Sequence, residues 1–147
     1  MIKELGGIQK IARVITSLDG LYTGTENKVR YAVSSYTGED TEEVKDALKE
    51  YFKGERLRAT IKKSSQGISF LSPTEARNVL EIIIYKKYLG KTVAVFDPRE
   101  HKERDTQRPV QRVPQAISIR LAKILLHLAG AKPGETIVDP FCGIGTI

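Results

Sequence analysis

The C-terminal stretch, E-T-I-V-D-P-F-C-G-I-G-T-I, constrains the fold more than any other part of the sequence. The apolar residues 136–138 predict a short buried β-strand, which Asp139 and Pro140 end. Gly143 and Gly145 then allow a tight backbone turn, because neither carries a Cβ. A strand that runs into a glycine loop predicts an open α/β sheet that receives a nucleotide-like ligand at this edge. The alternative interpretation is a tight turn after an ordinary strand.

This loop has the composition expected for a cofactor of the adenosine type. The glycines would let backbone N–H groups approach the cofactor, and Asp139 could accept a hydrogen bond at the carboxyl end of the strand. The run D-P-F-C-G-x-G-T resembles motif I of the amino-methyltransferases that use S-adenosylmethionine. The resemblance implies a Rossmann-like methyltransferase sheet, with the methionine end of the cofactor against the motif. The motif positions are Asp139, Phe141, Cys142, Gly143, Gly145 and Thr146.

The single cysteine allows a second interpretation, since a cysteine attacks the ring in cytosine-C5 methylation. That cysteine normally lies on another loop, so we interpret Cys142 as a small residue beneath the cofactor. His127 falls on the polar side of a predicted helix and His101 in a predicted linker. We therefore predict no catalytic residue in this chain.

The sequence stops shortly after Thr146, whereas a Rossmann-type domain needs several more strands and helices. The motif usually paired with motif I is an Asp/Asn-Pro-Pro-aromatic loop that holds the reacting amine, and it does not occur in the sequence. We therefore expect a fragment that contains one substrate-binding domain and the first turn of a catalytic domain. We expect the fragment alone to be inactive and to bind cofactor weakly or not at all.

Composition narrows the class of protein and of partner. The chain has 147 residues, 40% of them hydrophobic, which predicts a globular protein with one core. The net charge of +6 suits a polyanion such as RNA. One cysteine and two histidines argue against a metal centre. The apolar runs are too short to cross a bilayer and no signal peptide is evident, so we expect a cytoplasmic protein.

The first part of the chain alternates between helical and strand patterns. Apolar spacing predicts a helix at 8–15, and alternation predicts strands at 28–36 and 57–62. Asp40 with Glu43 predicts the start of a helix that ends near Gly54, and Ser72-Pro73-Thr74-Glu75 predicts the start of a short one. Further strands are predicted at 80–87 and 91–97, with a hairpin turn at 88–91.

This order of elements resembles the THUMP domain, an RNA-binding module of tRNA-modifying enzymes, and residues 1–98 are assigned to it. The ferredoxin-like portion that precedes it in such enzymes is absent from the sequence. The resemblance implies tRNA as the partner, recognised at its single-stranded acceptor end. Basic side chains are the candidate RNA contacts, although each one alone is more often a solvated surface residue. The candidates are Arg56, Arg58, Lys62, Lys63, Arg77, Lys86 and Lys87.

The segment 99–114 has charges of both signs and two prolines, which predicts a linker. Within it, Arg104-Asp105 and Arg108-Pro109 form an R-D-x-x-R-P pattern similar to the domain joint of archaeal tRNA guanine-N2 methyltransferases. Residues 115–147 are assigned to the start of the Rossmann-like domain. They begin with an amphipathic helix whose apolar positions are Ile117, Leu121, Ile124, Leu125 and Leu128.

The sequence thus predicts an α/β protein, with an α+β THUMP-like domain followed by the first helix and strand of a methyltransferase domain. The predicted function is the RNA-binding and partial cofactor-binding portion of an S-adenosylmethionine-dependent tRNA methyltransferase that acts on the exocyclic N2 of a guanosine. An alternative is a stand-alone tRNA-binding THUMP module without catalysis. A sulfur-insertion enzyme is disfavoured, because its nucleotide loop would have an ATP-pyrophosphatase pattern. The unpaired edge of an incomplete sheet also predicts self-association.

Overall fold

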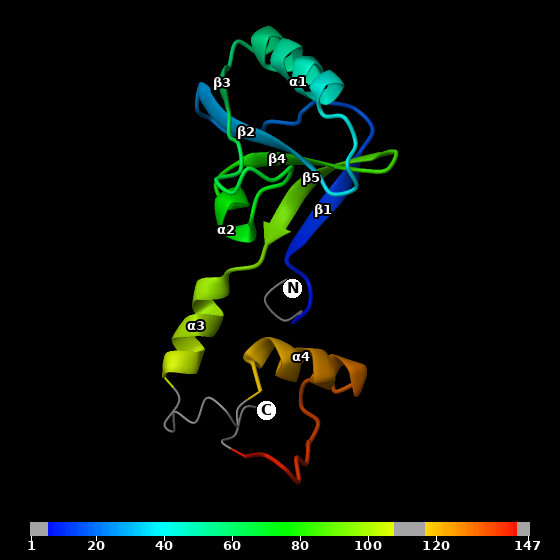
Figure 1. The fold of residues 1–147 in the computed structure, drawn as a ribbon, viewed down its shortest axis with the longest axis vertical. Helices are drawn as coiled ribbons and strands as arrows, with labels where there is room; N and C mark the ends of the chain where they lie inside the picture. The colour runs from blue at the N-terminus through cyan, green and yellow to red at the C-terminus, as the bar shows by residue number, and fades with distance from the viewer. Residues whose placement is uncertain (1–5, 108–116, 144–147) are drawn as a thin grey trace. The chain divides into compact units, whose positions relative to one another are not determined.

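The computed structural model describes residues 6–107 and 117–143, and Figure 1 shows the ribbon. The chain divides into two compact units, Lys10–Val95 and a second one formed by Met1–Gln9 with Phe96–Ile147. Each unit is described by itself below. The fold is mixed α/β, as the sequence predicts.

The Lys10–Val95 unit is built on a five-stranded mixed sheet with the order β1-β5-β4-β2-β3. The central strand β2 runs parallel to both β3 and β4, whereas β5 is antiparallel to β4 and β1 is antiparallel to β5. The strands are β1 (Lys10–Ile15), β2 (Lys28–Ser35), β3 (Arg58–Ile61), β4 (Leu80–Tyr85) and β5 (Tyr88–Val95). The helices of this unit are α1 (Glu42–Gly54) between β2 and β3, and α2 (Pro73–Ala76) between β3 and β4.

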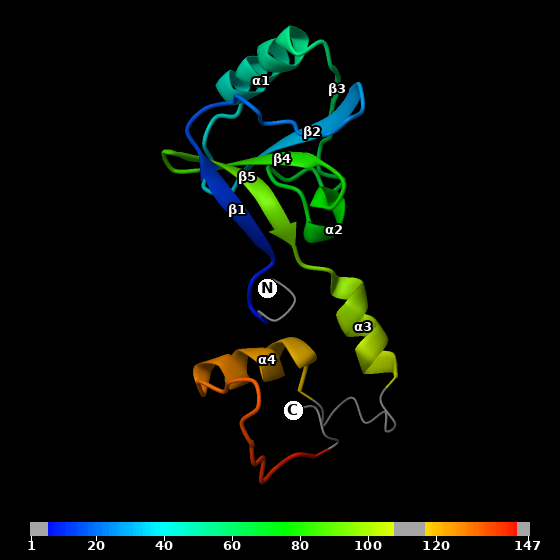
Figure 2. The same ribbon diagram turned by 180° about the vertical axis from the view of Figure 1, so that it is seen from behind.

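Two apolar layers hold the helices on opposite sides of the sheet, as Figures 1 and 2 show. Leu48 and Phe52 of α1 are 0% and 1% exposed and belong to the main core with Tyr31. The other layer is smaller and contains Leu71 and Ala76. The alternation of β2 explains this arrangement, because its odd-numbered residues reach the α1 layer while its even-numbered residues lie on the other face.

The structure contradicts the predicted helix at 8–15, because residues 10–15 form strand β1. Its backbone pairs with β5 from Lys10 opposite Val95 to Ile15 opposite Leu89, with a bulge after Ile11. The apolar spacing that suggested a helix is also compatible with an edge strand. Pairing with β5 decided between them, since the hydrogen bonds of the sheet are available only to the extended form.

The hairpin turn predicted at 88–91 is also wrong, since the β4–β5 turn consists of Lys86 and Lys87. Gly90 lies inside β5 instead. A Cβ at this position would come within 3.1 Å of the Cβ of Ala12, so close packing against β1, and not a turn, favours glycine here. Lys86 adopts φ +52°, the left-handed conformation that the turn demands.

The ends of α1 and α2 follow local rules that the sequence shows in part. Asp40 accepts a hydrogen bond from the Glu42 backbone N–H at 3.0 Å, and Ser72 forms the predicted capping box with Glu75. Helix α1 ends at Gly54, as predicted, but Arg56 and not the glycine takes the left-handed position after it, with φ +56°. The Leu57 N–H donates to the Phe52 carbonyl at 2.9 Å, which completes a Schellman motif.

The second unit contains α3 (Pro98–Thr106) and α4 (Ile119–Leu128). Helix α3 occupies the first part of the predicted linker, where Pro98 starts the helix and Asp97 accepts a hydrogen bond from the Arg99 N–H. Helix α4 confirms the predicted amphipathic helix and is capped by Ser118. Gly6 packs directly against α4, since a Cβ there would meet the Arg120 carbonyl at 2.3 Å, and Arg120 Nε donates to the Gly6 carbonyl at 2.9 Å.

Candidate functional site

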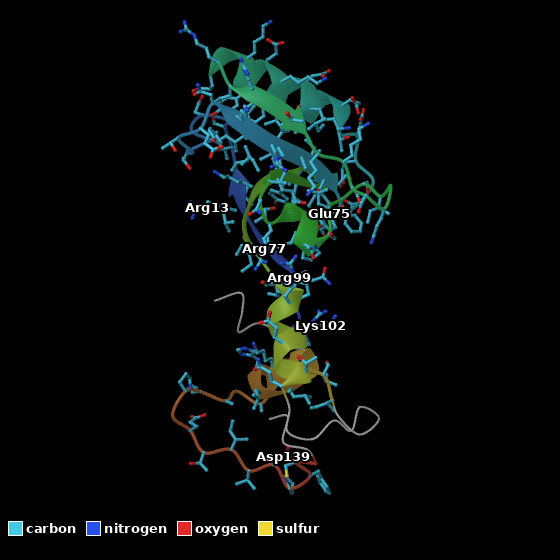
Figure 3. All side chains as sticks on the ribbon, turned by 90° about the vertical axis from the view of Figure 1, so that its left-hand side faces the viewer. Arg13, Glu75, Arg77, Arg99, Lys102 and Asp139 are labelled. Atoms are coloured by element: carbon cyan, nitrogen blue, oxygen red, sulfur yellow. The ribbon has the colours of Figure 1, made fainter. Side chains whose placement is uncertain are left out.

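The predicted cofactor loop forms an exposed turn at residues 139–143, and Figure 3 shows Asp139 on this irregular segment. The carboxylate of Asp139 accepts a hydrogen bond from the Phe141 N–H at 2.9 Å and so closes a local turn. Phe141 is 91% exposed and Cys142 is exposed too. Gly143 has φ +53°, a left-handed conformation that favours glycine, and the backbone turns here as predicted. Gly145 and Thr146 lie outside the described residues.

The strand predicted at 136–138 is not formed. The described residues therefore contain neither the predicted first strand of the methyltransferase domain nor a sheet edge formed by it. Residues 135–139 have no regular structure, and Val138 is 82% exposed. A strand is stable only when a neighbour accepts its backbone hydrogen bonds. In the described parts of the second unit, residues 6–9, 96–107 and 117–143, no strand is present to do so. Self-association therefore stays a prediction.

Large apolar side chains remain exposed along α4 and after it. Leu121 and Leu125 lie one turn apart on α4 and are each 44% exposed, while Leu128 is 80% exposed. Together with Val138 and Phe141 they form a set of apolar side chains that the described residues leave open to solvent. Such exposure is typical of a surface that packs against another element.

The candidate RNA contacts fall into separate groups. Arg58 of β3 lies opposite Lys28 of β2, and both line a shallow pocket of about 470 Å³ with Arg30. All three side chains are exposed. Lys28 and Arg30 are not among the candidates predicted from the sequence, although they occupy the polar positions of a predicted strand. Only the parallel pairing of β2 with β3 brings them beside Arg58.

A second group surrounds a pocket of about 260 Å³ between the N-terminus of α1 and the loop that follows β3. Lys62, Lys63 and Lys45 all line it. Lys62 is half-buried, and its Nζ donates to the Glu75 carbonyl at 2.9 Å, so this lysine also fastens α2 to β3. Lys45 is paired with Glu42 at 2.7 Å. Of these three lysines, Lys63 is the exposed one.

The remaining candidates are distributed over three turns. Arg56 ends α1, Arg77 ends α2 and is labelled with Glu75 in Figure 3, and Lys86 with Lys87 forms the β4–β5 turn. The ammonium of Lys86 lies 5.5 Å from the centre of the Tyr85 ring, and that of Lys87 lies 5.6 Å from the centre of the Tyr88 ring. The structure therefore does not gather all predicted RNA contacts on one surface.

Two glutamate carboxylates hold loops in place by hydrogen bonds, and their pKa values lie far below the ordinary value of a glutamate. Hydrogen bonds from the side chain and backbone of Ser65, followed by those of Ser72, lower the pKa of Glu75 to about 2. The Thr37 hydroxyl, followed by the Ser35 hydroxyl, lowers the pKa of Glu39 to about 2. The same carboxylate accepts a hydrogen bond from the Lys86 N–H at 2.7 Å, which ties the loop after β2 to the β4–β5 turn.

One charged cluster is buried inside the Lys10–Val95 unit. The Glu81 side chain is 0% exposed and pairs with Lys10 Nζ at 2.6 Å. Ser34 Oγ and Thr92 Oγ1 donate to the same carboxylate at 2.6 and 2.8 Å, and Lys10 also donates to the Leu71 carbonyl at 2.6 Å. Each polar group of the cluster has a hydrogen-bond partner. The cluster also lacks the access to solvent that a substrate would need, so we interpret it as structural.

Two negative findings concern the described part of the chain. No group of three or more His, Cys, Asp or Glu side chains in residues 6–107 and 117–143 could hold a metal ion. Within the same ranges no helix has the length and apolar character needed to span a bilayer. The predicted linker arginines Arg108 and Arg112 and the side chains of His101, Arg104 and Asp105 lie outside the described residues.

Comparison with known protein families gives a match over residues 106–147 to the family described as RMKL-like, methyltransferase domain. The matched segment begins at the last residue of α3 and includes α4 and the turn at 139–143. The C-terminal part of the chain is thus similar to a methyltransferase domain. This agrees at the level of the general class with the prediction from the glycine loop.

Proposed function

We propose that this chain is the RNA-binding portion and part of the cofactor-binding portion of an S-adenosylmethionine-dependent tRNA methyltransferase. The proposed reaction is methylation of the exocyclic N2 of a guanosine. Residues 1–98 are the THUMP-like RNA-binding domain, 99–114 the connection, and 115–147 the start of the methyltransferase domain. The observation that carries the proposal is the match of residues 106–147 to a methyltransferase domain, with the D-P-F-C-G-x-G-T run inside the matched segment.

The glycine turn has the properties that a ligand close to the backbone requires. An added Cβ at Gly143 would have no atom nearer than the Phe141 carbonyl at 3.8 Å, so the Cα faces open space. The positive φ of Gly143 turns the chain sharply next to the exposed Cys142. These features fit the methionine end of S-adenosylmethionine, held by the motif residues Asp139, Phe141, Cys142 and Gly143, with Gly145 and Thr146 beyond the described range.

In amine methylation the cofactor and the protein have different tasks. S-adenosylmethionine, when bound, supplies an electrophilic methyl group. The protein must hold the amine nitrogen in line with that methyl, free the lone pair of the nitrogen and exclude water. The turn at 139–143 serves the first task by positioning the cofactor. The loop that would hold the amine has no counterpart in the sequence, so we assign no catalytic residue.

The Lys10–Val95 unit is the proposed tRNA-binding part. Its basic side chains are exposed at the β2–β3 pair, where Lys28, Arg30 and Arg58 line one pocket, and at the β4–β5 turn. Cations in such positions neutralise phosphates and make binding salt-dependent. The net charge of +6 supports a polyanionic partner.

Chemical modification of Cys142 tests the cofactor site, because this is the single cysteine in the sequence. The cofactor is expected to bind this chain weakly, so S-adenosylmethionine should slow the reaction of Cys142 with a thiol reagent only at millimolar concentration. Adenosine alone should protect less, since the methionine end is placed at the motif. Asp139→Ala should weaken the protection. A rate of modification that millimolar S-adenosylmethionine leaves unchanged would overturn the assignment of the turn as a cofactor site in this chain.

The substrate is tested with unmodified tRNA and tritiated S-adenosylmethionine. We expect the chain to bind the tRNA, with an affinity that falls as salt rises, but not to transfer label on its own. Turnover by the chain alone would contradict the expectation that the missing amine-holding loop is required. Label recovered in a nucleoside other than N2-methylguanosine would overturn the proposed position of methylation.

A stand-alone tRNA-binding module is the second candidate function. It is favoured by the exposed, irregular conformation of residues 135–143. The two candidates differ in the Cys142 experiment, because a binding module without a cofactor site predicts tRNA binding without protection of Cys142.

A further inference from the structure

We propose that Tyr36, Tyr85 and Tyr88 form a stacking platform for unpaired bases of single-stranded RNA, with Lys86 and Lys87 as its phosphate contacts. This inference rests on the proposed function, since it names where RNA binds in the Lys10–Val95 unit. We refer to these five residues as the tyrosine platform.

Strand register places the three tyrosines on one face of the sheet. Tyr85 of β4 lies directly opposite Tyr88 of β5. Ile83, two positions before Tyr85 on the same strand, lies opposite Ser34 of β2. Side chains two residues apart lie on the same face of a strand, so Tyr36, which directly follows the end of β2, comes on the face of Tyr85.

Contacts of the buried cluster confirm which face this is. Ser34 and Thr92 both donate to Glu81, so the even-numbered residues of β2 and this part of β5 share the face of Glu81. The ammonium of Lys10, which pairs with Glu81, lies 5.7 Å from the centre of the Tyr36 ring. The Tyr36 ring therefore lies on the same face of the sheet as Tyr85 and Tyr88.

The rings are fixed and open at the same time. Tyr36, Tyr85 and Tyr88 are 42%, 48% and 50% exposed, far more than the core tyrosine Tyr31 at 3%. Tyr36 is held by stacking on Phe70, with ring centres 4.7 Å apart and an angle of 17° between the planes. Neighbouring strands lie about 4.8 Å apart, so side chains from adjacent strands form a closely spaced row. A row of exposed rings on a rigid sheet suits base stacking, which contributes to binding without regard to sequence.

The turn between Tyr85 and Tyr88 presents two cations at the end of this row. Lys86 and Lys87 are exposed and lie 5.5 and 5.6 Å from the centres of the Tyr85 and Tyr88 rings. Lys86 holds a left-handed backbone, with φ +52°, which glycine would adopt at lower cost. A lysine at a position where glycine is favoured is consistent with a task of its side chain.

The loop contacts of Glu39 hold this turn in place. Its carboxylate accepts hydrogen bonds from the Lys86 N–H at 2.7 Å and from the Ser35 hydroxyl at 2.8 Å. Because Glu39 belongs to the loop that also carries Tyr36, this one side chain connects Tyr36 with the β4–β5 turn. The platform is thus preorganised, which lowers the entropy lost when RNA binds.

Unpaired RNA fits this surface better than other partners. Flat rings can stack only on bases whose faces are free, and these are hidden in a duplex. The five side chains of the platform include two cations and no carboxylate. The oxygens of the neighbouring Glu39 are already engaged by backbone and hydroxyl donors. This balance of charge complements phosphates, whereas an acidic protein segment would leave the stacking rings without a function.

Fluorescence anisotropy with the full chain tests the platform, using a labelled single-stranded RNA oligonucleotide and a duplex of the same sequence. Tyr85→Leu with Tyr88→Leu should weaken binding of the single strand by about thirtyfold or more, since two bases lose the rings on which they stack. Tyr85→Phe with Tyr88→Phe keeps the rings and should bind like the wild type. Lys86→Ala with Lys87→Ala should reduce the slope of log K against log salt by roughly 1.4, about 0.7 for each phosphate contact.

The matched control is Lys49→Ala with Lys53→Ala, which removes the same charge from α1 and should leave the slope nearly unchanged. Circular dichroism must show the same folded signal for each variant, and the Phe variants keep the test valid if the Leu variants unfold. Wild-type protein that binds no RNA would overturn the proposed RNA-binding function itself. Wild-type binding that the Leu variants retain, a Phe variant as weak as the Leu variant, or an equal loss on the duplex would overturn the platform alone. Tight binding of an acidic peptide in place of RNA would favour a protein partner and likewise overturn it.

Discussion

Glu81→Ala should destabilise the Lys10–Val95 unit strongly, because it leaves a buried ammonium without its counter-ion. The Lys10 side chain is 7% exposed, and the Glu81 carboxylate at 2.6 Å is its only anionic partner among the ion pairs of the described residues. After the substitution Lys10 retains its hydrogen bond to the Leu71 carbonyl. A single neutral acceptor does not replace a carboxylate in a site that water hardly reaches.

The expected magnitude follows from the geometry of the cluster. Removing one partner of a buried ion pair costs about 3–5 kcal/mol, and the hydroxyls of Ser34 and Thr92 lose their acceptor as well. The double substitution Lys10→Met with Glu81→Leu removes both charges and keeps most of the volume. It should cost roughly 1–2 kcal/mol, mainly because the hydroxyls of Ser34 and Thr92 lose their acceptor, although Ser34 still accepts a hydrogen bond from the Leu71 N–H.

Urea unfolding of the full chain provides the measurement, followed by far-ultraviolet circular dichroism and by hydrogen exchange of the β4 amides. The exchange reports on the Lys10–Val95 unit separately, since the two units need not unfold together. Asp46→Ala is the surface control, because its pair with Lys49 is largely exposed and should change stability by less than about 1 kcal/mol. A Glu81→Ala variant as stable as this control, or a double variant as unstable as the single one, would refute the reasoning.

Three further predictions concern other parts of the chain. Arg56→Gly should raise the free energy of unfolding by about 1 kcal/mol in denaturant titrations, because it relieves a left-handed conformation at φ +56°; a loss of stability would contradict this. Ser65→Ala with Ser72→Ala should raise the pKa of Glu75 from about 2 towards its ordinary value of 4.5, as followed by carboxyl NMR. Since the folded-state pKa is the lower one, the stabilisation from Glu75 is present above pH 4.5 and is lost as the pH falls towards 2. Lys28→Glu with Arg58→Glu should weaken tRNA binding by roughly tenfold at low salt, and an unchanged affinity there would exclude the β2–β3 pocket as a phosphate contact.

Local chemistry explains why part of this fold can be read directly from the sequence. The alternation at 28–36 predicts β2, and the Ser72-Pro73 start with Glu75 predicts the capping box of α2. The apolar spacing after residue 117 predicts α4. In each case the interactions that decide the structure join residues a few positions apart, so a short window of sequence contains them.

Tertiary pairing decided the features that the sequence alone left open or suggested wrongly. Residues 10–15 became a strand because β5 offers hydrogen bonds, and residues 136–138 remain irregular because no described neighbour does. The grouping of Arg58 with Lys28, the burial of Glu81 and the row of tyrosines all depend on which strands lie side by side. These contacts join residues that are far apart in the sequence. The alternation of a strand shows on which face of the sheet a side chain lies, but it does not show which side chains lie next to it. The glycine turn was therefore evident from the sequence, whereas the surface proposed to hold single-stranded RNA emerged only from the folded sheet.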